Sequence, residues 1–95
     1  MATIQVTTYI LKPGVTPQQF IAADEALQEW TYLHVEGIAR RTTARSSSGK
    51  WITIRLFADG SQTNTDWFDS QDPVVVAWRE LVDETSIDYC DYDLL

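Results

Sequence analysis

The spacing of hydrophobic residues along this chain changes from two residues to about 3.6 and back. This order of spacings restricts the possible folds more than any other feature of the sequence. Residues 3–11 alternate at the two-residue period of a β-strand. One face carries Ile4, Val6, Thr8 and Ile10, and the other carries Gln5, Thr7, Tyr9 and Leu11. The run Lys12-Pro13-Gly14 is expected to end the strand, because proline and glycine favour turns.

A helix is predicted directly after this turn, because several start signals occur together. Thr16 is the expected N-cap, Pro17 takes the first helical position, and Gln19 closes a capping box. The apolar stripe at helical spacing consists of Phe20, Ala23, Leu27 and Trp30. The polar residues mostly off this stripe are Asp24, Gln28 and Glu29. We expect the helix to end near Leu33 or His34.

The middle of the chain predicts a β-hairpin. Residues 37–45 and 50–57 have strand character, and residues 46–49 form the turn between them. In the second strand, one face carries Trp51, Thr53, Arg55 and Phe57, and the other carries Ile52, Ile54 and Leu56. After a turn at Asp59-Gly60, residues 61–70 are expected to form a short helix or a loop. The apolar residues of that segment are Trp67 and Phe68.

The last part of the chain predicts a second helix and a fourth strand. Asp72-Pro73 supplies a cap and a first helical position for a helix that should stop before Ser86. Its inward stripe consists of Val75, Trp78 and Val82. Residues 87–94 return to strand character and include three aspartates, Asp88, Asp91 and Asp93.

The order of elements is therefore strand, helix, strand, strand, helix, strand, without an internal repeat. Right-handed crossovers around the two helices place the strands in the spatial order 4-1-3-2 of an antiparallel sheet. This is the ferredoxin-like α+β arrangement, βαββαβ. A length of 95 residues fits one such domain, spanning residues 1–95.

Composition excludes several functional classes. A hydrophobic fraction of 44% is typical of a folded chain. No apolar run approaches the roughly 20 residues that cross a bilayer, and the N-terminus lacks a signal-peptide pattern, so we expect a cytoplasmic protein without membrane contact. The net charge of -7 repels phosphate backbones, and no nucleic-acid-binding motif is present, so nucleic acid is not an expected partner.

Positive charge is concentrated in one part of this acidic chain. Five of the seven cations fall within residues 39–57, namely Arg40, Arg41, Arg45, Lys50 and Arg55. The second and fourth strands are the edges of the predicted sheet; the basic edge carries Arg40, Arg41 and Arg45, and the acidic edge carries Asp88, Asp91 and Asp93. A two-fold homodimer brings unlike edges together and closes two sheets into a barrel, with ion pairs selecting the orientation and apolar burial supplying stability. The alternative is that these edge charges only prevent aggregation.

A resemblance to a known family is carried by residues 27–60, LQEWTYLHVEGIARRTTARSSSGKWITIRLFADG, and by the first strand with its KPG exit. The shared signals are a helix ending near Trp30, Gly37 opening a strand, Gly49 in the hairpin, and an aliphatic third strand. Over about residues 4–83, the chain resembles the dimeric α/β-barrel superfamily, in particular its antibiotic-biosynthesis monooxygenase branch. The resemblance implies a homodimer with helices outside and a ligand pocket between sheet and helices in each subunit.

Several activities are implied by that resemblance, including cofactor-independent oxygenation of polycyclic phenols, polyketide cyclisation, lactone isomerisation and haem degradation. The phenol-oxidising members carry an Asn and, four residues later, a Trp at positions that match Ile54 and Ala58 here. A related polyketide cyclase uses a His near the second helix, where residues 70–80 contain none. The implied function is a cofactor-independent monooxygenase acting on an aromatic or polyketide-like substrate. The alternatives are a polyketide cyclase-like enzyme and a non-catalytic binding or dimeric assembly module.

The candidate substrate-binding residues are aromatic or polar side chains expected to face the helices. They are Gln5, Tyr9, Trp30, Trp67, Phe68 and Trp78. If the apolar face of the first strand packs at the dimer, its mixed face points at the helices, and Gln5 and Tyr9 orient a flat aromatic ligand. Trp67 and Phe68 lie in a polar segment that could act as a lid. The alternative is that the aromatic residues are simply core.

Three other side chains receive structural interpretations. His34, the only histidine, lies at a helix end, where a C-terminal cap is favoured over a catalyst. Cys90 is expected to be a buried structural thiol. Arg55 is expected to face the dimer interior, where it needs Asp91, Asp88 or a bound anion. No metal and no organic cofactor is expected, because neither metal-ligand spacing nor a phosphate-binding loop is present.

Overall fold

The computed structural model, which describes residues 2–58 and 66–95, has the predicted strand order. Its strands are β1 (Thr3–Tyr9), β2 (Ile38–Arg45), β3 (Trp51–Phe57) and β4 (Asp88–Asp93). They form one sheet in the order β2-β3-β1-β4, and all neighbouring strands are antiparallel. Counted from β4, this is the order 4-1-3-2, so the predicted ferredoxin-like topology is confirmed.

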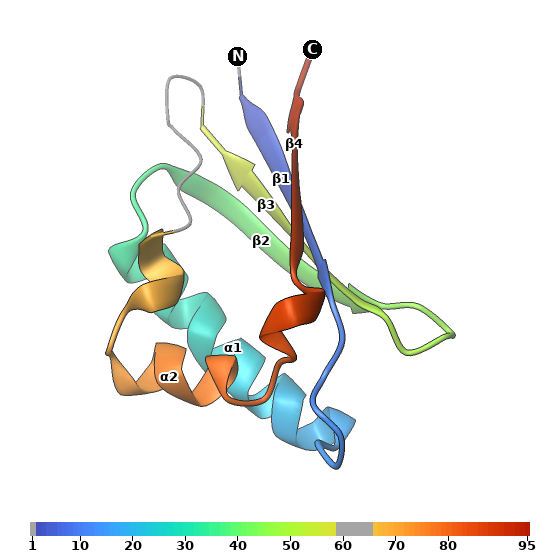
Figure 1. The fold of residues 1–95 in the computed structure, drawn as a ribbon. Helices are drawn as coiled ribbons and strands as arrows, with labels where there is room; N and C mark the ends of the chain where they lie inside the picture. Colours follow the sequence, from blue (N-terminus) through green and yellow to red (C-terminus); the bar gives the residue numbers. More distant parts are fainter. Residues whose placement is uncertain (1, 59–65) are drawn as a thin grey trace.

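Helices cover one face of this sheet. They are α1 (Pro17–His34), α2 (Pro73–Arg79), and the 3-10 helices η1 (Asp66–Asp69) and η2 (Glu84–Ser86). Figure 1 shows α1 and α2 on the same side of the sheet, whose other side is uncovered, and the two termini next to each other at one end of the sheet. Across the described ranges, no helix has the length and apolar character needed to span a bilayer.

Both ends of α1 follow the predicted signals. The backbone N–H of Gln19 donates to Thr16 Oγ1 at 3.2 Å, and the N–H of Thr16 donates to Gln19 Oε1 at 2.9 Å, which completes the capping box. At the other end, His34 Nδ1 donates to the carbonyl oxygen of Trp30 at 2.9 Å. His34 therefore occupies a C-terminal capping position, with its ring stacked on Trp30 at 4.7 Å.

The second helix is shorter than predicted. It begins at Pro73 and stops before Ser86 as expected, but it ends at Arg79, so Val82 of the predicted inward stripe lies beyond the helix. The chain then leaves the helix to pair with the extension of β1, where Leu11 and Val82 form an antiparallel bridge. Because that pairing uses backbone groups that a longer helix would need, the longer helix is lost. The predicted turn at 59–60 and the first half of segment 61–70 lie outside the described residues.

The core lies between the sheet and the helices. Its buried members are Tyr9, Phe20, Leu27, Trp51, Val75, Trp78 and Val82. Aromatic rings contact each other here, with centroids 5.3 Å apart for Tyr9 and Trp78 and 4.7 Å apart for Phe20 and Trp51. The mixed face of β1 is buried against the helices as predicted, and its apolar face is half-buried on the uncovered side.

Candidate functional site

The helix-facing side of the sheet is polar in its middle. Strand register places two rows of neighbouring side chains across β2, β3, β1 and β4 in that order. The first row, which we call the arginine row, is Arg41, Arg55, Gln5 and Asp91. The second row is Thr43, Thr53, Thr7 and Tyr89. The members that are at most 2% exposed are Arg41, Arg55, Gln5, Thr53 and Thr7, so a polar layer lies inside the fold.

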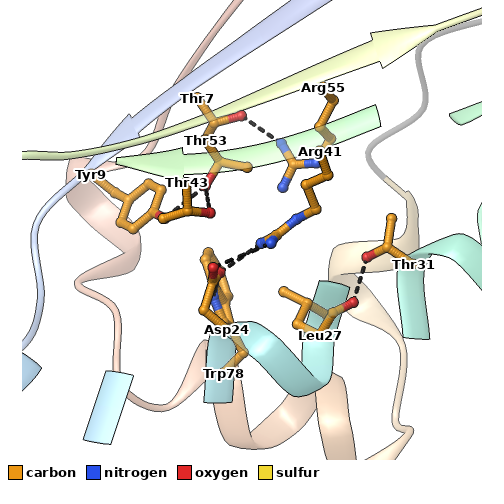
Figure 2. Close-up of polar contacts among 10 residues, drawn as sticks. All are labelled: Thr7, Tyr9, Asp24, Leu27, Thr31, Arg41, Thr43, Thr53, Arg55 and Trp78. Atoms are coloured by element: carbon orange, nitrogen blue, oxygen red, sulfur yellow. Dashed lines mark hydrogen bonds and ion pairs between the residues drawn. The ribbon is translucent and has the colours of Figure 1, made fainter. Parts of the chain in front are cut away.

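An ion pair joins this polar layer to α1. Arg41 Nη2 donates to Asp24 Oδ1 at 2.7 Å, and Arg41 Nη1 donates to Asp24 Oδ2 at 3.3 Å. Trp78 Nε1 donates to Asp24 Oδ1 at 3.0 Å, so the carboxylate receives hydrogen bonds from both β2 and α2 (Figure 2). The Arg41 side chain is fully buried, and that of Asp24 is 10% exposed. The ion pair therefore lies almost entirely away from water.

The burial of Asp24 corrects the predicted stripe of α1. The buried residues of this helix are Phe20, Asp24, Leu27 and Thr31, at helical spacing. Asp24 is therefore on the buried face, although a carboxylate is seldom buried without a partner. Its partner Arg41 is 17 residues away in sequence and reaches it only once β2 has joined the sheet.

Arg55 also differs from its predicted orientation. It is 1% exposed within a single chain and faces the helices, because it pairs across the strands with Gln5. Arg55 Nη1 donates to Thr7 Oγ1 at 2.9 Å, and the guanidinium carbon lies 4.9 Å from the ring centroid of Trp67. Burial, followed by the like charge of Arg41, lowers the pKa of Arg55 to about 10. The guanidinium therefore still carries its charge at neutral pH.

Neither of the carboxylates predicted for Arg55 lies beside it. Asp91 follows Gln5 in the arginine row, two strands from Arg55, which is roughly 10 Å at the usual spacing of strands. Asp88 pairs with Thr8 and shares the uncovered face of the sheet. The predicted direction of Arg55 is wrong because it treated the face of β3 independently of β1, whereas register links the two; the third predicted partner, a bound anion, stays a prediction.

Tyr9 is a hydrogen-bonding group rather than a base. Its hydroxyl lies 2.7 Å from Thr53 Oγ1, which in turn lies 3.3 Å from Thr43 Oγ1. Burial raises the pKa of Tyr9 to about 12. The phenol is therefore protonated at neutral pH and can orient a neighbour but cannot accept a proton as a general base.

Four buried polar atoms have no hydrogen-bond partner among the described residues. They are Gln5 Oε1, Trp30 Nε1, Arg41 Nε and Arg55 Nε. An unpaired buried polar group costs about 1–3 kcal/mol, so such groups are rare without a reason. Three of the four belong to neighbouring members of the arginine row. Unused hydrogen-bonding capacity is therefore concentrated there.

Four of the six predicted site residues come together. Tyr9 and Trp78 lie in the core, and the half-buried rings of Trp67 and Phe68 in η1 lie 6.2 Å and 6.3 Å from the Trp78 ring. Arg79 of α2 holds η1 in place, since its Nη1 donates to the carbonyl oxygen of Phe68. These four aromatic residues form one continuous group that reaches Arg55 through Trp67.

The other two predicted residues occupy different positions. Gln5 lies in the arginine row beside Arg55. Trp30 lies near the C-terminal end of α1, where it packs against the core and stacks with His34. Sequence reasoning missed Asp24 and Arg41 as a pair, although the two-residue period of β2 and the helical spacing of α1 both turn them inward.

A groove of about 370 Å³ lies between α1 and β2. Its walls include Asp24 on the helix side and Thr43 and Trp51 on the sheet side. None of the six predicted residues lines it. The groove therefore gives the ion pair its small contact with solvent but is separate from the predicted aromatic group.

Cys90 is exposed, so the prediction of a buried thiol is wrong. It lies on the edge strand β4 and pairs with Val6, whose side chain faces the uncovered side of the sheet. A residue on that face has no helix above it in a single chain. Alternation alone could not show which face of β4 the helices cover.

Chemically, the polar layer is suited to holding a negatively charged oxygen. Its buried members offer two guanidinium groups, a carboxamide and threonine hydroxyls, and the one buried carboxylate among the described residues is that of Asp24. The only histidine lies at the exposed end of α1 and is used as a cap. Within residues 2–58 and 66–95, no group of three or more His, Cys, Asp or Glu side chains is placed to hold a metal ion.

The fold and the site together define a ferredoxin-like α+β protein with a buried polar layer between sheet and helices. No protein-family model matches the sequence, and no curated protein matches it. Solved structures do match its fold over nearly the whole chain.

One of these structures is a protein from Bordetella bronchiseptica provisionally assigned as an antibiotic biosynthesis monooxygenase, with 16% identity, a TM-score of 0.68, and coverage of 99% of this chain and 97% of that one. Another is SnoaB, a cofactor-independent oxygenase from Streptomyces nogalater, with 16% identity, a TM-score of 0.66, and coverage of 99% and 93%. A third is a dimeric protein of unknown function and ferredoxin-like fold from Bacteroides fragilis, with 14% identity, a TM-score of 0.58, and coverage of 98% and 96%. The chain therefore has the fold of antibiotic biosynthesis monooxygenase-like structures, which confirms the resemblance inferred from the sequence at the level of the fold.

Proposed function

We propose that this chain is a homodimeric, cofactor-independent monooxygenase that acts on an aromatic or polyketide-like substrate held between sheet and helices. The observation that supports the proposal is the arginine row, whose buried members Arg41, Arg55 and Gln5 each have a polar atom without a partner among residues 2–58 and 66–95. This row lies beside the aromatic group that ends at Trp67, which gives the layer both polar and aromatic surface. The likeness of the fold to that of SnoaB supports the choice of reaction class.

In such a reaction the substrate itself supplies the electrons. All four electrons that reduce O₂ come from the substrate: the carbon activated by the ionised phenol or enol goes from CH₂ to C=O, one oxygen atom enters the product, and the other leaves as water with the two hydrogen atoms lost from that carbon. The described residues favour holding the substrate anion, since Tyr9 stays protonated and Asp24 is already paired with Arg41. A buried positive group lowers the pKa of a bound phenol, so the substrate could ionise without a strong protein base.

The homodimer is proposed from the uncovered face of the sheet. Its apolar members are Ile4, Val6, Ile52, Ile54, Leu56 and Tyr92. Ile54 is 39% exposed and Tyr92 is 55% exposed, whereas a sheet normally buries its apolar faces. Arg40 and Asp88 lie on the same face at opposite edges, so a two-fold axis can bring each toward the other in the second copy. Arg41 is not available for this edge contact, because its side chain is paired with Asp24.

Oxygen uptake with a panel of anthrones and hydroquinones tests the proposed reaction. The wild-type protein should consume oxygen with at least one of these compounds, and Trp67→Ala should lower the rate, because it removes the ring beside Arg55. Leu33→Ala, at an 80% exposed position of α1, is the matched control and should leave the rate unchanged. The monooxygenase proposal is rejected if no compound in the panel is oxidised.

A non-catalytic binding or assembly module is the second candidate. It is favoured by the position of Ile54, which faces away from the polar layer and cannot place a hydrogen-bond donor there. A protein that binds the same aromatic compounds but consumes no oxygen would belong to this second class.

A further inference from the structure

We infer that Arg55, flanked by Arg41 and Gln5, is the binding site for the anionic oxygen group of a flat aromatic ligand, a carboxylate or a phenolate. The inference deepens the proposed function by naming the charge of the ligand and the residue that holds it. It rests on that function only for the place of binding, between sheet and helices, and it does not require any oxidation.

The first argument is the balance of charge in the buried layer. Asp24 receives hydrogen bonds from both terminal nitrogens of Arg41 and from Trp78, so its oxygens are already engaged. Arg55 has the neutral hydroxyl of Thr7 as its hydrogen-bond acceptor among the described residues. The two arginines are direct cross-strand neighbours, an arrangement in which like charges repel. Among the described residues, no carboxylate is bonded to Arg55, in a place from which water is largely excluded, and an anion would supply that counter-charge.

The second argument concerns hydrogen-bonding groups of the arginine row that have no partner among the described residues. The Nε atoms of Arg41 and Arg55 are buried donors without acceptors in the part of the chain that the structure describes. A carboxylate or phenolate oxygen can accept from more than one N–H, and such charge-assisted bonds are stronger than neutral ones. Gln5, the neighbour of Arg55 on the other side, can turn its amide to donate as well, because its oxygen is also unpaired. Figure 2 shows both guanidinium groups on the helix side of the sheet, with Arg41 reaching Asp24 of α1 and Arg55 bonded to Thr7 of β1.

The third argument is the aromatic surface on Arg55. The Trp67 ring lies 4.9 Å from the guanidinium carbon, at a cation–π distance. The Arg55 guanidinium therefore already packs against one flat ring, that of Trp67. A ligand that carries a ring and an anionic oxygen would match both features, whereas a bare inorganic anion would match only the charge.

A purely structural role for Arg55 makes different predictions. In that case the guanidinium would serve only its bond to Thr7 and its contact with Trp67, and ligand charge would not matter. Replacing a buried charged side chain with an apolar one of similar length often leaves stability unchanged or raises it. Arg55→Met is therefore expected to fold, and folding is verified by circular dichroism before any binding is measured.

The test is isothermal titration calorimetry with 2-naphthoate and its neutral isostere 2-naphthamide. We expect wild-type protein to bind the carboxylate at least about tenfold more tightly than the amide, and Arg55→Met to lose about 10- to 100-fold of the carboxylate affinity. Lys50→Met, which removes an exposed cation from the hairpin turn, is the control for net charge and should bind like wild type.

The inference is overturned if the amide binds as well as the carboxylate, if Arg55→Met binds the carboxylate like wild type, or if neither compound binds at millimolar concentration. If Arg55→Met does not fold, the comparison of the two compounds on wild type, together with a conservative Arg55→Lys variant, still decides the outcome. Selective carboxylate binding without oxygen uptake would support the anion site and contradict the monooxygenase proposal. Oxygen uptake that is unaffected by Arg55→Met would support the monooxygenase proposal and contradict the anion site.

Discussion

Asp24→Asn tests whether the buried ion pair holds α1 against the sheet. In the native protein, Asp24 Oδ1 accepts hydrogen bonds from Arg41 Nη2 and Trp78 Nε1, and Oδ2 accepts one from Arg41 Nη1. An asparagine keeps the shape and one acceptor oxygen, which can still serve Trp78. Its amide NH₂ then meets a guanidinium donor, and Arg41 becomes a buried cation without a counter-charge.

The expected cost follows from this arrangement. Removing one member of a buried ion pair destabilises a protein by about 3–5 kcal/mol, because the remaining charge stays away from water. The fully buried side chain of Arg41 justifies this range rather than the smaller values found for surface pairs. For a domain of this size each 1 kcal/mol lowers the melting temperature by about 4–8 °C, so we expect a decrease of at least roughly 12 °C.

Urea denaturation followed by tryptophan fluorescence, at one fixed protein concentration, measures this cost. Glu25→Gln, at the adjacent exposed position, is the matched control and should change the free energy of unfolding by no more than about 0.5 kcal/mol. In an Arg41→Met background, Asp24→Asn should cost much less, since no cation is left unpaired. The reasoning is refuted if Asp24→Asn costs under about 1 kcal/mol, or if it costs the same in both backgrounds.

Two further predictions follow from the pKa of Tyr9 and from the uncovered face of the sheet. The pKa of Tyr9 rises from 10.0 to about 12 on folding, so its contribution to the free energy of unfolding is fully present below pH 10 and is lost as the pH rises through 12. Wild type should therefore lose more stability than Tyr9→Phe over this alkaline range in denaturation experiments, and equal losses would contradict the shift. Ile54→Lys places a charge on the uncovered apolar face and should convert the proposed dimer to a folded monomer in sedimentation experiments. A wild-type protein that is monomeric at micromolar concentration would contradict the proposed dimer.

Much of the fold could be predicted because its signals act over short distances. The capping box of Thr16 and Gln19 and the cap of His34 involve residues within four positions of each other. The two-residue period of β1 correctly turned Gln5 and Tyr9 toward the helices. Val82 was wrongly assigned to the stripe of α2, because it forms a bridge with Leu11, which is far away in the chain.

The candidate site was only partly predictable for the same reason. The aromatic residues of the site were visible as apolar side chains, and two of them, Trp67 and Phe68, stood out in a polar segment. The orientations of Asp24 and Arg55 were not predicted, because a charged side chain is assigned to solvent or to an interface until its buried neighbours are known. The buried neighbours of Asp24 and of Arg55 belong to other strands and helices.

The sequence by itself determined which elements form and in what order, since caps, turns and hydrophobic periods are interactions among residues a few positions apart. The tertiary structure decided which charged groups are buried together. Asp24 meets Arg41 across 17 positions, and Arg55 meets Thr7 across 48, only when strand register sets which side chains share a row. Register is a property of the assembled sheet, so these charged side chains come together only in the folded protein.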